Sequence, residues 1–290
     1  MMHFVCSAVI RTGIKCLQVL LALLALAFPS VHAESFKLGG TGSGLAMMQI
    51  LADAYSAQDK DFQLSIMPNL GSSGGIKALN AGAIDIAVTS RDLKPAESNF
   101  GMESVEYGRT PFVLATSSAD PRGVTTSQAV DLISGRVTRW PDGKLVRLVM
   151  RPMSDGDSGL LSSFSNEMRS AVSTTMKRTD LVIAVTDQDS VNMLEKLPGS
   201  FGSSSLAVIL AEKKRVYPIS LDGVMPSAKT LAAHRYPFYK KMHLITKGSP
   251  VGQVKQFIDF VRSPAGRDLL TQNGHWVSNV SKQKGSLGQK

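Results

Sequence analysis

Short apolar segments of strand length alternate with segments of helical periodicity along most of the chain, from residue 36 to residue 274. In the segment 46–55, for example, the apolar residues recur at helical spacing, whereas "DIAVT" (85–89) reads as a short buried strand. Strands that alternate with helices in this way are typical of α/β proteins. We therefore predict a fold of the α/β class.

Two longer extended segments, 110–117 and 236–248, interrupt this alternation. The first leaves one set of strands and helices, and the second rejoins it before two closing helices. A chain of this length can bury two separate cores. The pattern predicts two lobes joined by two hinge crossovers: lobe one comprises residues 34–110 and 238–290, and lobe two comprises residues 111–237.

The first 33 residues have the pattern of a secretory signal peptide. Basic residues precede an apolar run at 17–28, and Val31, His32 and Ala33 provide the small residues of a cleavage site. This run of 12 residues is shorter than the roughly 20 that a membrane span needs. We expect cleavage after Ala33 and export.

The chain's two cysteines, Cys6 and Cys16, both lie in this leader, so the exported part has no disulfide. Export without disulfides fits a bacterial periplasm better than a eukaryotic secretory route. We therefore predict a periplasmic protein.

The charge and residue patterns exclude several classes of function. The formal net charge of +9 favours anionic partners, but no basic stripe with interleaved aromatic residues indicates nucleic-acid binding. The three histidines beyond the leader share no metal-ligand spacing, and "GGTGSG" does not have the glycine spacing of a dinucleotide-binding loop. We expect neither a metal nor a cofactor.

Three loops share one design: each follows a predicted strand, is rich in glycine and hydroxyl groups, and opens a helix. They are "GTGSGL" (40–45), "GSSGG" (71–75) and "SDGDSGLL" (154–161), and "TSR" (89–91) follows another strand. Helix N-termini offer unpaired amides and a partial positive charge, and ligands of α/β sheets bind beyond the carboxyl ends of the strands. These loops therefore predict a site for one small oxyanion.

The order of these loops, followed by the tail "YPFYKKMHLITKGSPVGQVKQFIDFVRSPAGRDLL", resembles the periplasmic phosphate-binding proteins of phosphate ABC transporters. The resemblance covers nearly all of the chain after the leader. It implies a two-lobed, type II-like clamshell of the periplasmic-binding-protein kind. It also implies a monomer that binds phosphate or a similar oxyanion and delivers it to the membrane permease of an ABC importer.

Carried over position by position, the resemblance implies binding by the amides of Gly44 and Leu45, by Ser72, by Ser90 where the phosphate-specific proteins have an aspartate, and by Arg151, Ser158, Gly159 and Leu160 in the third loop. Two of these residues, Gly44 and Leu160, replace threonines, and Arg151 lies farther from Ser158 than in the family. Four neighbours complete the predicted site: Ser43, Ser73, Arg91 and Asp157. Either Arg91 or Arg151 supplies the positive charge.

The choice of oxyanion depends on Ser90, because a hydroxyl both donates and accepts and cannot separate protonated phosphate from sulfate. Either Asp157 or Asp92 then supplies the missing acceptor, or selectivity against sulfate is relaxed. The alternative role for Asp157 is to cap the helix that follows it. We favour phosphate.

Two other functions remain open. "GSSGG" also fits the G-x-S-x-G pattern of a serine hydrolase with Ser73 as the nucleophile, and His234, His243 and His275 follow it in the chain. None of these histidines has an obvious acidic partner on a loop, so we expect a binding protein and not an enzyme. A solitary oxyanion binder that serves a sensor would show the same sequence pattern.

Overall fold

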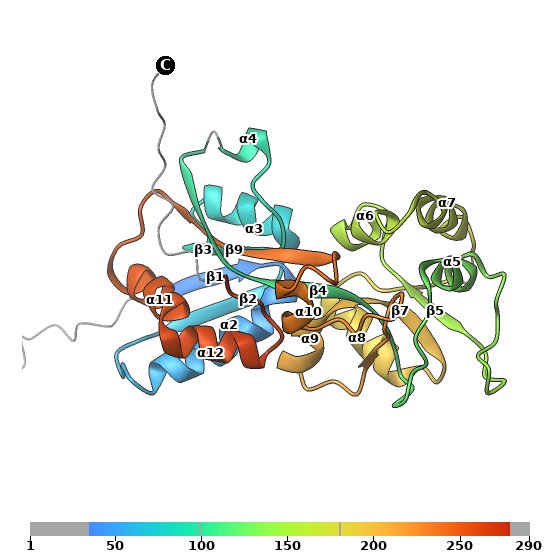
Figure 1. The fold of residues 1–290 in the computed structure, drawn as a ribbon. Coiled ribbons are helices and arrows are strands. Elements are labelled where there is room, and N and C mark those ends of the chain that lie inside the picture. Colours follow the sequence, from blue (N-terminus) through green and yellow to red (C-terminus); the bar gives the residue numbers. More distant parts are fainter. Residues whose placement is uncertain (1–34, 99, 180, 279–290) are drawn as a thin grey trace, which may run out of the picture. The chain divides into compact units, whose positions relative to one another are not determined.

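The computed structural model describes residues 35–98, 100–179 and 181–278. The predicted signal peptide, with Cys6 and Cys16, lies outside the described residues. Within those ranges, no helix has the length and apolar character needed to cross a membrane. Figure 1 shows strands and helices alternating along the chain, as the sequence predicts.

The elements are taken in chain order. The strands are β1 (Phe36–Gly40), β2 (Leu64–Asn69), β3 (Ile86–Thr89), β4 (Met102–Thr116), β5 (Arg147–Met150), β6 (Val182–Ile183), β7 (Ser200–Ser205), β8 (Tyr217–Pro218) and β9 (Tyr239–Lys247). The helices are α2 (Gly42–Ser56), α3 (Gly71–Asn80), α4 (Pro95–Ser98), α5 (Thr126–Ser134), α6 (Gly156–Ser162), α7 (Asn166–Thr175), α8 (Asp187–Lys196), α9 (Leu206–Ala211), α10 (Ala228–Ala232), α11 (Gly252–Arg262) and α12 (Pro264–Gln272).

The strands are ordered β2-β1-β3-β9-β4-β7-β5-β6, and β8 pairs with β4. The strands β1, β2 and β3 run parallel to one another, as do β5, β6 and β7, whereas β4 and β9 are antiparallel to their neighbours. Parallel strands end at one edge of a sheet, so the loops that follow β1, β2 and β3 come together. The loops that follow β5 and β6 come together for the same reason.

The long strand β4 connects the two groups of parallel strands (Figure 1). Its residues Met102 to Pro111 pair with β9, and its residues Phe112 to Ala115 pair with β7. The two extended segments predicted from the sequence are therefore neighbours in the sheet. Both segments pass from one group of parallel strands to the other, at the point where the pairing partner of β4 changes from β9 to β7.

The buried apolar side chains form separate clusters on the two sides of the point at which β4 stops pairing with β9 and begins to pair with β7. One pair of clusters gathers around β1, β3 and β9 with α2, α3, α11 and α12, and includes Leu38 and Phe257. The other pair gathers around β5 and β7 with α5, α7, α8 and α9, and includes Phe112 and Phe201. Each group of parallel strands thus has its own core.

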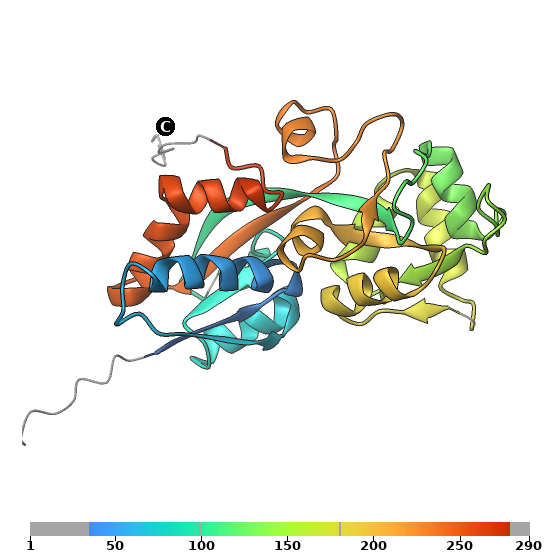
Figure 2. The ribbon, with the colours of Figure 1, turned by 90° about the horizontal axis from the view of Figure 1, so that it is seen from below.

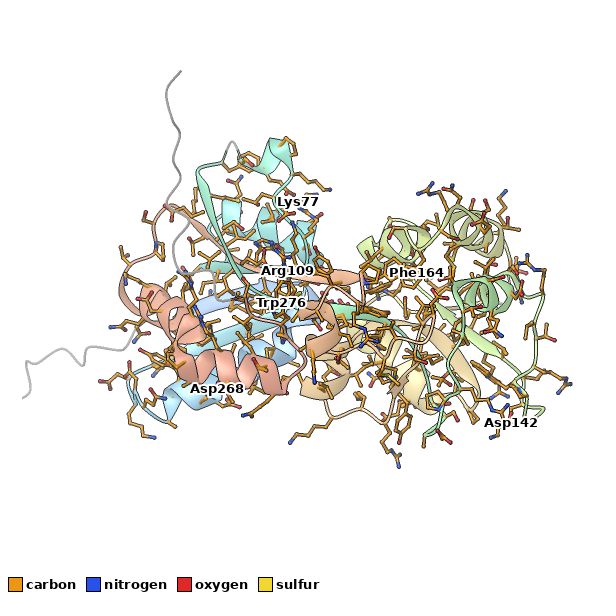
Figure 3. The ribbon with its side chains drawn as sticks, in the orientation of Figure 1. Lys77, Arg109, Asp142, Phe164, Asp268 and Trp276 are labelled. Atoms are coloured by element: carbon orange, nitrogen blue, oxygen red, sulfur yellow. The ribbon has the colours of Figure 1, made fainter. Side chains whose placement is uncertain are left out.

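The C-terminal part of the described chain packs back onto β4. The backbones of Arg109 and Trp276 exchange two hydrogen bonds, of 2.8 and 2.7 Å. The Arg109 guanidinium also lies 5.2 Å from the ring centroid of Trp276 and 5.3 Å from that of Tyr239 (Figure 3). These contacts hold the end of the described chain beside the strand that links the two groups.

Two parts of the fold differ from what the local sequence favours. The pattern of residues 160–171 favours one helix, but α6 ends at Ser162 and α7 begins after Ser165, whose hydroxyl accepts a hydrogen bond from the amide of Met168. The sequence also gave no indication of β7, "SFGSSS", although all six of its residues are buried. Two of its serines have internal partners: Ser200 Oγ donates to the Leu194 carbonyl at 2.7 Å, and Ser205 Oγ accepts from the amide of Val208 at 3.4 Å.

Candidate oxyanion site

A cavity of about 1080 Å³ lies where the loops after β1, β2 and β3 meet the loops after β5 and β6. Eight of the predicted site residues line it: Ser72, Ser73, Ser90, Arg91, Arg151, Asp157, Gly159 and Leu160. Thr41, in the first predicted loop, also lines it, as do residues not predicted from the sequence, among them Asn69, Asp155, Asp187, Phe238 and Lys240. The predicted loops therefore converge on one space.

Four predicted residues do not line this cavity. Ser43 is buried and donates its hydroxyl to Asp187, and the side chain of Leu45 packs against the core cluster of Leu38. A Cβ placed on Gly44 would lie 2.6 Å from Val88 Cγ1, so this side of the backbone faces the core. Ser158 Oγ turns inward and donates to the Arg151 carbonyl at 3.0 Å.

The second loop and the end of β3 form one hydroxyl-rich corner of the cavity. The amide of Ser90 donates to Ser72 Oγ at 3.1 Å, and the two hydroxyl oxygens are 3.3 Å apart. Asn69 organises the neighbouring backbone, because its Oδ1 accepts hydrogen bonds from the amides of Gly42 (3.1 Å) and Gly71 (2.8 Å). A single side chain thus caps the starts of both α2 and α3.

Arg91 is held in a fixed position beside this corner. Its guanidinium makes two hydrogen bonds of 2.8 Å to the carboxylate of Glu97, and Nη2 donates to Ser73 Oγ at 3.1 Å. The hydrogen bond from Arg91 lowers the pKa of Glu97 to about 2. Arg91 therefore reaches the cavity as a cation that already has a carboxylate partner.

Arg151 is also paired, and it is almost fully buried at 4% exposure. Its Nη2 donates to Asp155 Oδ2 at 2.7 Å and its Nη1 to the Ala184 carbonyl at 3.0 Å, while Nε has no partner among the described residues. Asp155 is the N-cap of α6, since its Oδ1 accepts from the amide of Asp157 at 2.9 Å. The alternative expectation that Asp157 caps this helix was therefore wrong.

At the cavity wall, one ammonium group joins two carboxylates. Lys240 Nζ lies 2.5 Å from Asp157 Oδ1, 3.2 Å from Asp187 Oδ1 and 2.8 Å from Ser43 Oγ. Ser43 Oγ donates to the same Asp187 oxygen at 2.6 Å. Lys240 belongs to β9, Ser43 to α2, Asp157 to α6 and Asp187 to α8, so this cluster connects elements from both groups of strands.

Burial and charge act against each other in this cluster. Burial raises the pKa of Asp157 to about 6, although Lys240 opposes the shift. Burial also acts to raise the pKa of Asp187, but the Lys240 ammonium and the Ser43 hydrogen bond outweigh it and leave that pKa below its usual value. Burial disfavours the charged form of Lys240, yet the two carboxylates raise its pKa. The ammonium therefore stays charged.

The sequence analysis missed Lys240 and Asp187. Lys240 lies in "YKKMHLITK", where two adjacent lysines give no indication that the first is buried and the second is partly exposed. Asp187 resembles an ordinary acidic residue of a first helical turn. Among the described residues, no group of three or more His, Cys, Asp and Glu side chains is placed to hold a metal ion.

Comparison with known proteins places this arrangement in a family. The model of the PBP superfamily domain matches residues 30–265. The chain is 26% identical over 250 residues to the phosphate-binding protein PstS of Bacillus subtilis (strain 168), which covers 81% of this chain and 79% of that protein.

Solved structures share the fold at lower identity. A putative phosphate ABC transporter substrate-binding protein with bound phosphate from Clostridium perfringens has a TM-score of 0.70 at 22% identity, over 84% of this chain and all of that chain. The periplasmic molybdate-binding protein of Azotobacter vinelandii has a TM-score of 0.59 at 15% identity, over 84% and 99% of the two chains. These likenesses confirm the predicted two-lobed α/β fold. Since the family model matches well over half of the chain, this protein belongs to the PBP superfamily.

Proposed function

We propose that this protein is a periplasmic binding protein that captures phosphate and delivers it to the permease of an ABC importer. The observation that carries the proposal is the convergence of the predicted loops on one cavity, in a chain related along most of its length to a phosphate-binding protein. Ser72, Ser90 and the start of α3 offer the hydroxyl and amide donors that an oxyanion requires.

Phosphate is the favoured oxyanion because of the sequence relationship and not because of the fold. The fold is shared with a molybdate-binding protein, so it does not select among oxyanions. A sequence match over 250 residues, in contrast, is to a protein named for phosphate. Delivery to a permease is part of the same proposal, and a solitary binder that serves a sensor would use the same site.

We further propose that residues 34–110 and 238–290 form lobe one and residues 111–237 form lobe two. The separate core clusters support this division, because Leu38 and Phe257 lie in one and Phe112 and Phe201 in the other. β4 and β9 would serve as the two hinge crossovers. The division predicts that ligand closes lobe two onto lobe one.

The first prediction tests the proposed ligand. Phosphate at 100 times its dissociation constant should stabilise the native protein by about 2.7 kcal/mol, because a ligand that binds only the native state raises its stability by RT ln(1 + [L]/Kd). Thermal unfolding is measured with phosphate, sulfate, molybdate and chloride at equal ionic strength. A panel in which no oxyanion raises the midpoint would contradict the proposal.

The alternative function, a serine hydrolase, requires Ser73 to act as the nucleophile. Among the described residues, the Ser73 hydroxyl accepts a hydrogen bond from the Arg91 guanidinium. His243 Nδ1 instead lies 3.1 Å from Ser104 Oγ, and His275 is fully buried. A catalytic serine requires a general base, most often a histidine, within hydrogen-bond distance. The contacts of Ser73 therefore favour a binding role.

The second prediction concerns this serine. We expect no covalent adduct at Ser73 after incubation with a fluorophosphonate probe, measured by intact mass and peptide mapping. A known serine hydrolase in a parallel reaction is the positive control, and Ser73→Ala is the matched variant. An adduct that forms on the wild type and is lost in Ser73→Ala would establish the hydrolase instead.

A further inference from the structure

The start of α2 already has an anion beside it, and that anion belongs to the protein. The N-cap residue of this 15-residue helix, Thr41, makes no side-chain capping bond. Asn69 accepts from the Gly42 amide, and the Asp187 carboxylate lies beside it: Oδ1 accepts from Ser43 Oγ at 2.6 Å, and Oδ2 lies 3.0 Å from the position of a Cβ on Gly42. Asp187 thus stands at the positive end of α2, where an anion is stabilised.

Further contacts hold the start of α8 against the start of α2. Gln188 Nε2 donates to the Gly42 carbonyl at 3.0 Å, and a Cβ on Gly42 would lie only 2.3 Å from Gln188 Oε1. The two helices contact each other, and α2 is the blue helix in Figure 2. This close approach requires a glycine at position 42.

Two cations favour a negative charge at this position. Lys240 Nζ lies 3.2 Å from Asp187 Oδ1. The Arg151 side chain lines the same cavity and acts electrostatically on Asp187, and its buried Nε has no hydrogen-bond partner among the described residues. A hydroxyl donor, a helix N-terminus and two buried cations are the groups that a tetrahedral oxyanion would use.

We propose that the Asp187 carboxylate is an internal competitor of the ligand: it occupies the anion position at the start of α2, and an incoming oxyanion must displace it. The inference rests on the proposed function of the same cavity. Displacement would break the Ser43 and Lys240 contacts of Asp187, which join α8 to α2 and β9. Asp187 therefore lowers the affinity for the oxyanion and holds the two groups of strands together while ligand is absent.

The third prediction is that Asp187→Asn binds inorganic phosphate at least tenfold more tightly than the wild type, measured by calorimetric titration. Asparagine keeps an acceptor for Ser43 but removes the competing charge, and Lys240 retains Asp157 as its partner. The matched control is Asp92→Asn, which removes one negative charge from the same cavity at a side chain that is 62% exposed and, among the described residues, forms no ion pair with Lys240 or Arg151. We expect the affinity of this control variant for phosphate to rise by less than threefold. An equal gain in both variants, or weaker binding by Asp187→Asn, would overturn the inference.

A second measurement needs no ligand and separates this inference from the proposed function. Without phosphate, amide hydrogen exchange in residues 41–45 and 186–190 should be at least tenfold faster in Asp187→Asn than in the wild type, and unchanged in Asp92→Asn. Ser43→Ala removes the other side of the contact and should accelerate exchange in the same segments. If phosphate binds to none of these proteins, the proposed function fails while this measurement still decides the inference. Unchanged exchange in both Asp187→Asn and Ser43→Ala would refute it.

Discussion

Replacing Lys240 with methionine is expected to lower the free energy of unfolding by about 3–5 kcal/mol at pH 7.5, the typical cost of removing one partner from a buried ion pair. The ammonium is 3% exposed and lies within 3.2 Å of both Asp157 and Asp187. Methionine fills a similar volume but leaves two buried carboxylates without a counter-ion. Urea unfolding of the two proteins measures the difference.

The neighbouring lysine provides the matched control. Lys241 is 36% exposed and pairs with Asp92, which is 62% exposed. Exposed ion pairs contribute about 0–1 kcal/mol, so Lys241→Met should change the free energy of unfolding by no more than about 1 kcal/mol. A comparable loss in the two variants would show that the buried cluster has no special role.

The loss of unfolding free energy caused by Lys240→Met should depend on pH. Burial raises the pKa of Asp157 in the native wild type to about 6, above the ordinary value of about 3.9. A carboxyl with a raised native pKa contributes its full stabilisation below the unfolded pKa and loses it as the pH rises through the native one. Without Lys240, which lowers the pKa of both Asp157 and Asp187, both values should rise.

The loss caused by Lys240→Met is therefore expected to be largest above pH 6 and to shrink as the pH falls toward about 4, where the unpaired carboxyls take up protons. Urea unfolding at several pH values between these limits measures it. A difference in unfolding free energy that stays constant across this range would contradict the assignment of Lys240 as the counter-ion of these carboxylates.

Asp157→Asn is expected to abolish the preference for phosphate over sulfate, which should be at least about tenfold in the wild type. At neutral pH phosphate keeps a proton and can donate to a carboxylate, whereas sulfate cannot. Asp157 lines the cavity, is 6% exposed and does not cap α6, so its carboxylate is placed to act as that acceptor. An acceptor left unpaired by sulfate costs about 1–3 kcal/mol.

Calorimetric titration of each anion into the wild type and Asp157→Asn gives the ratio of affinities. Asp92→Asn is the control, because Asp92 also lines the cavity but is largely exposed and already paired with Lys241. If the ratio changes in Asp92→Asn and not in Asp157→Asn, Asp92 is the acceptor. Equal ratios in all three proteins would exclude both carboxylates from anion selection.

The amino-acid sequence by itself determined the fold class and the region of the site. Apolar periodicity of two kinds marks strands and helices, because burial requires the alternation of a sheet or the stripe of a helix. The loops with Ser72, Ser90 and Arg151 could be found as well, since each directly follows a strand of a parallel group. Their position at one edge of the sheet follows from the topology alone.

Only the tertiary structure decided which side chains meet in the site. Lys240 lies 53 residues from Asp187 and 197 from Ser43 along the chain, and nothing local marks these residues as partners. The segment of β7 likewise has the composition of a loop, yet it is a buried strand, and the hydroxyl of its Ser200 donates to the Leu194 carbonyl of α8. Local sequence patterns indicate how a segment forms its own backbone hydrogen bonds and which of its apolar side chains it buries. The cost of burying a charge or a hydroxyl, in contrast, is offset by partners that only the complete fold brings within reach.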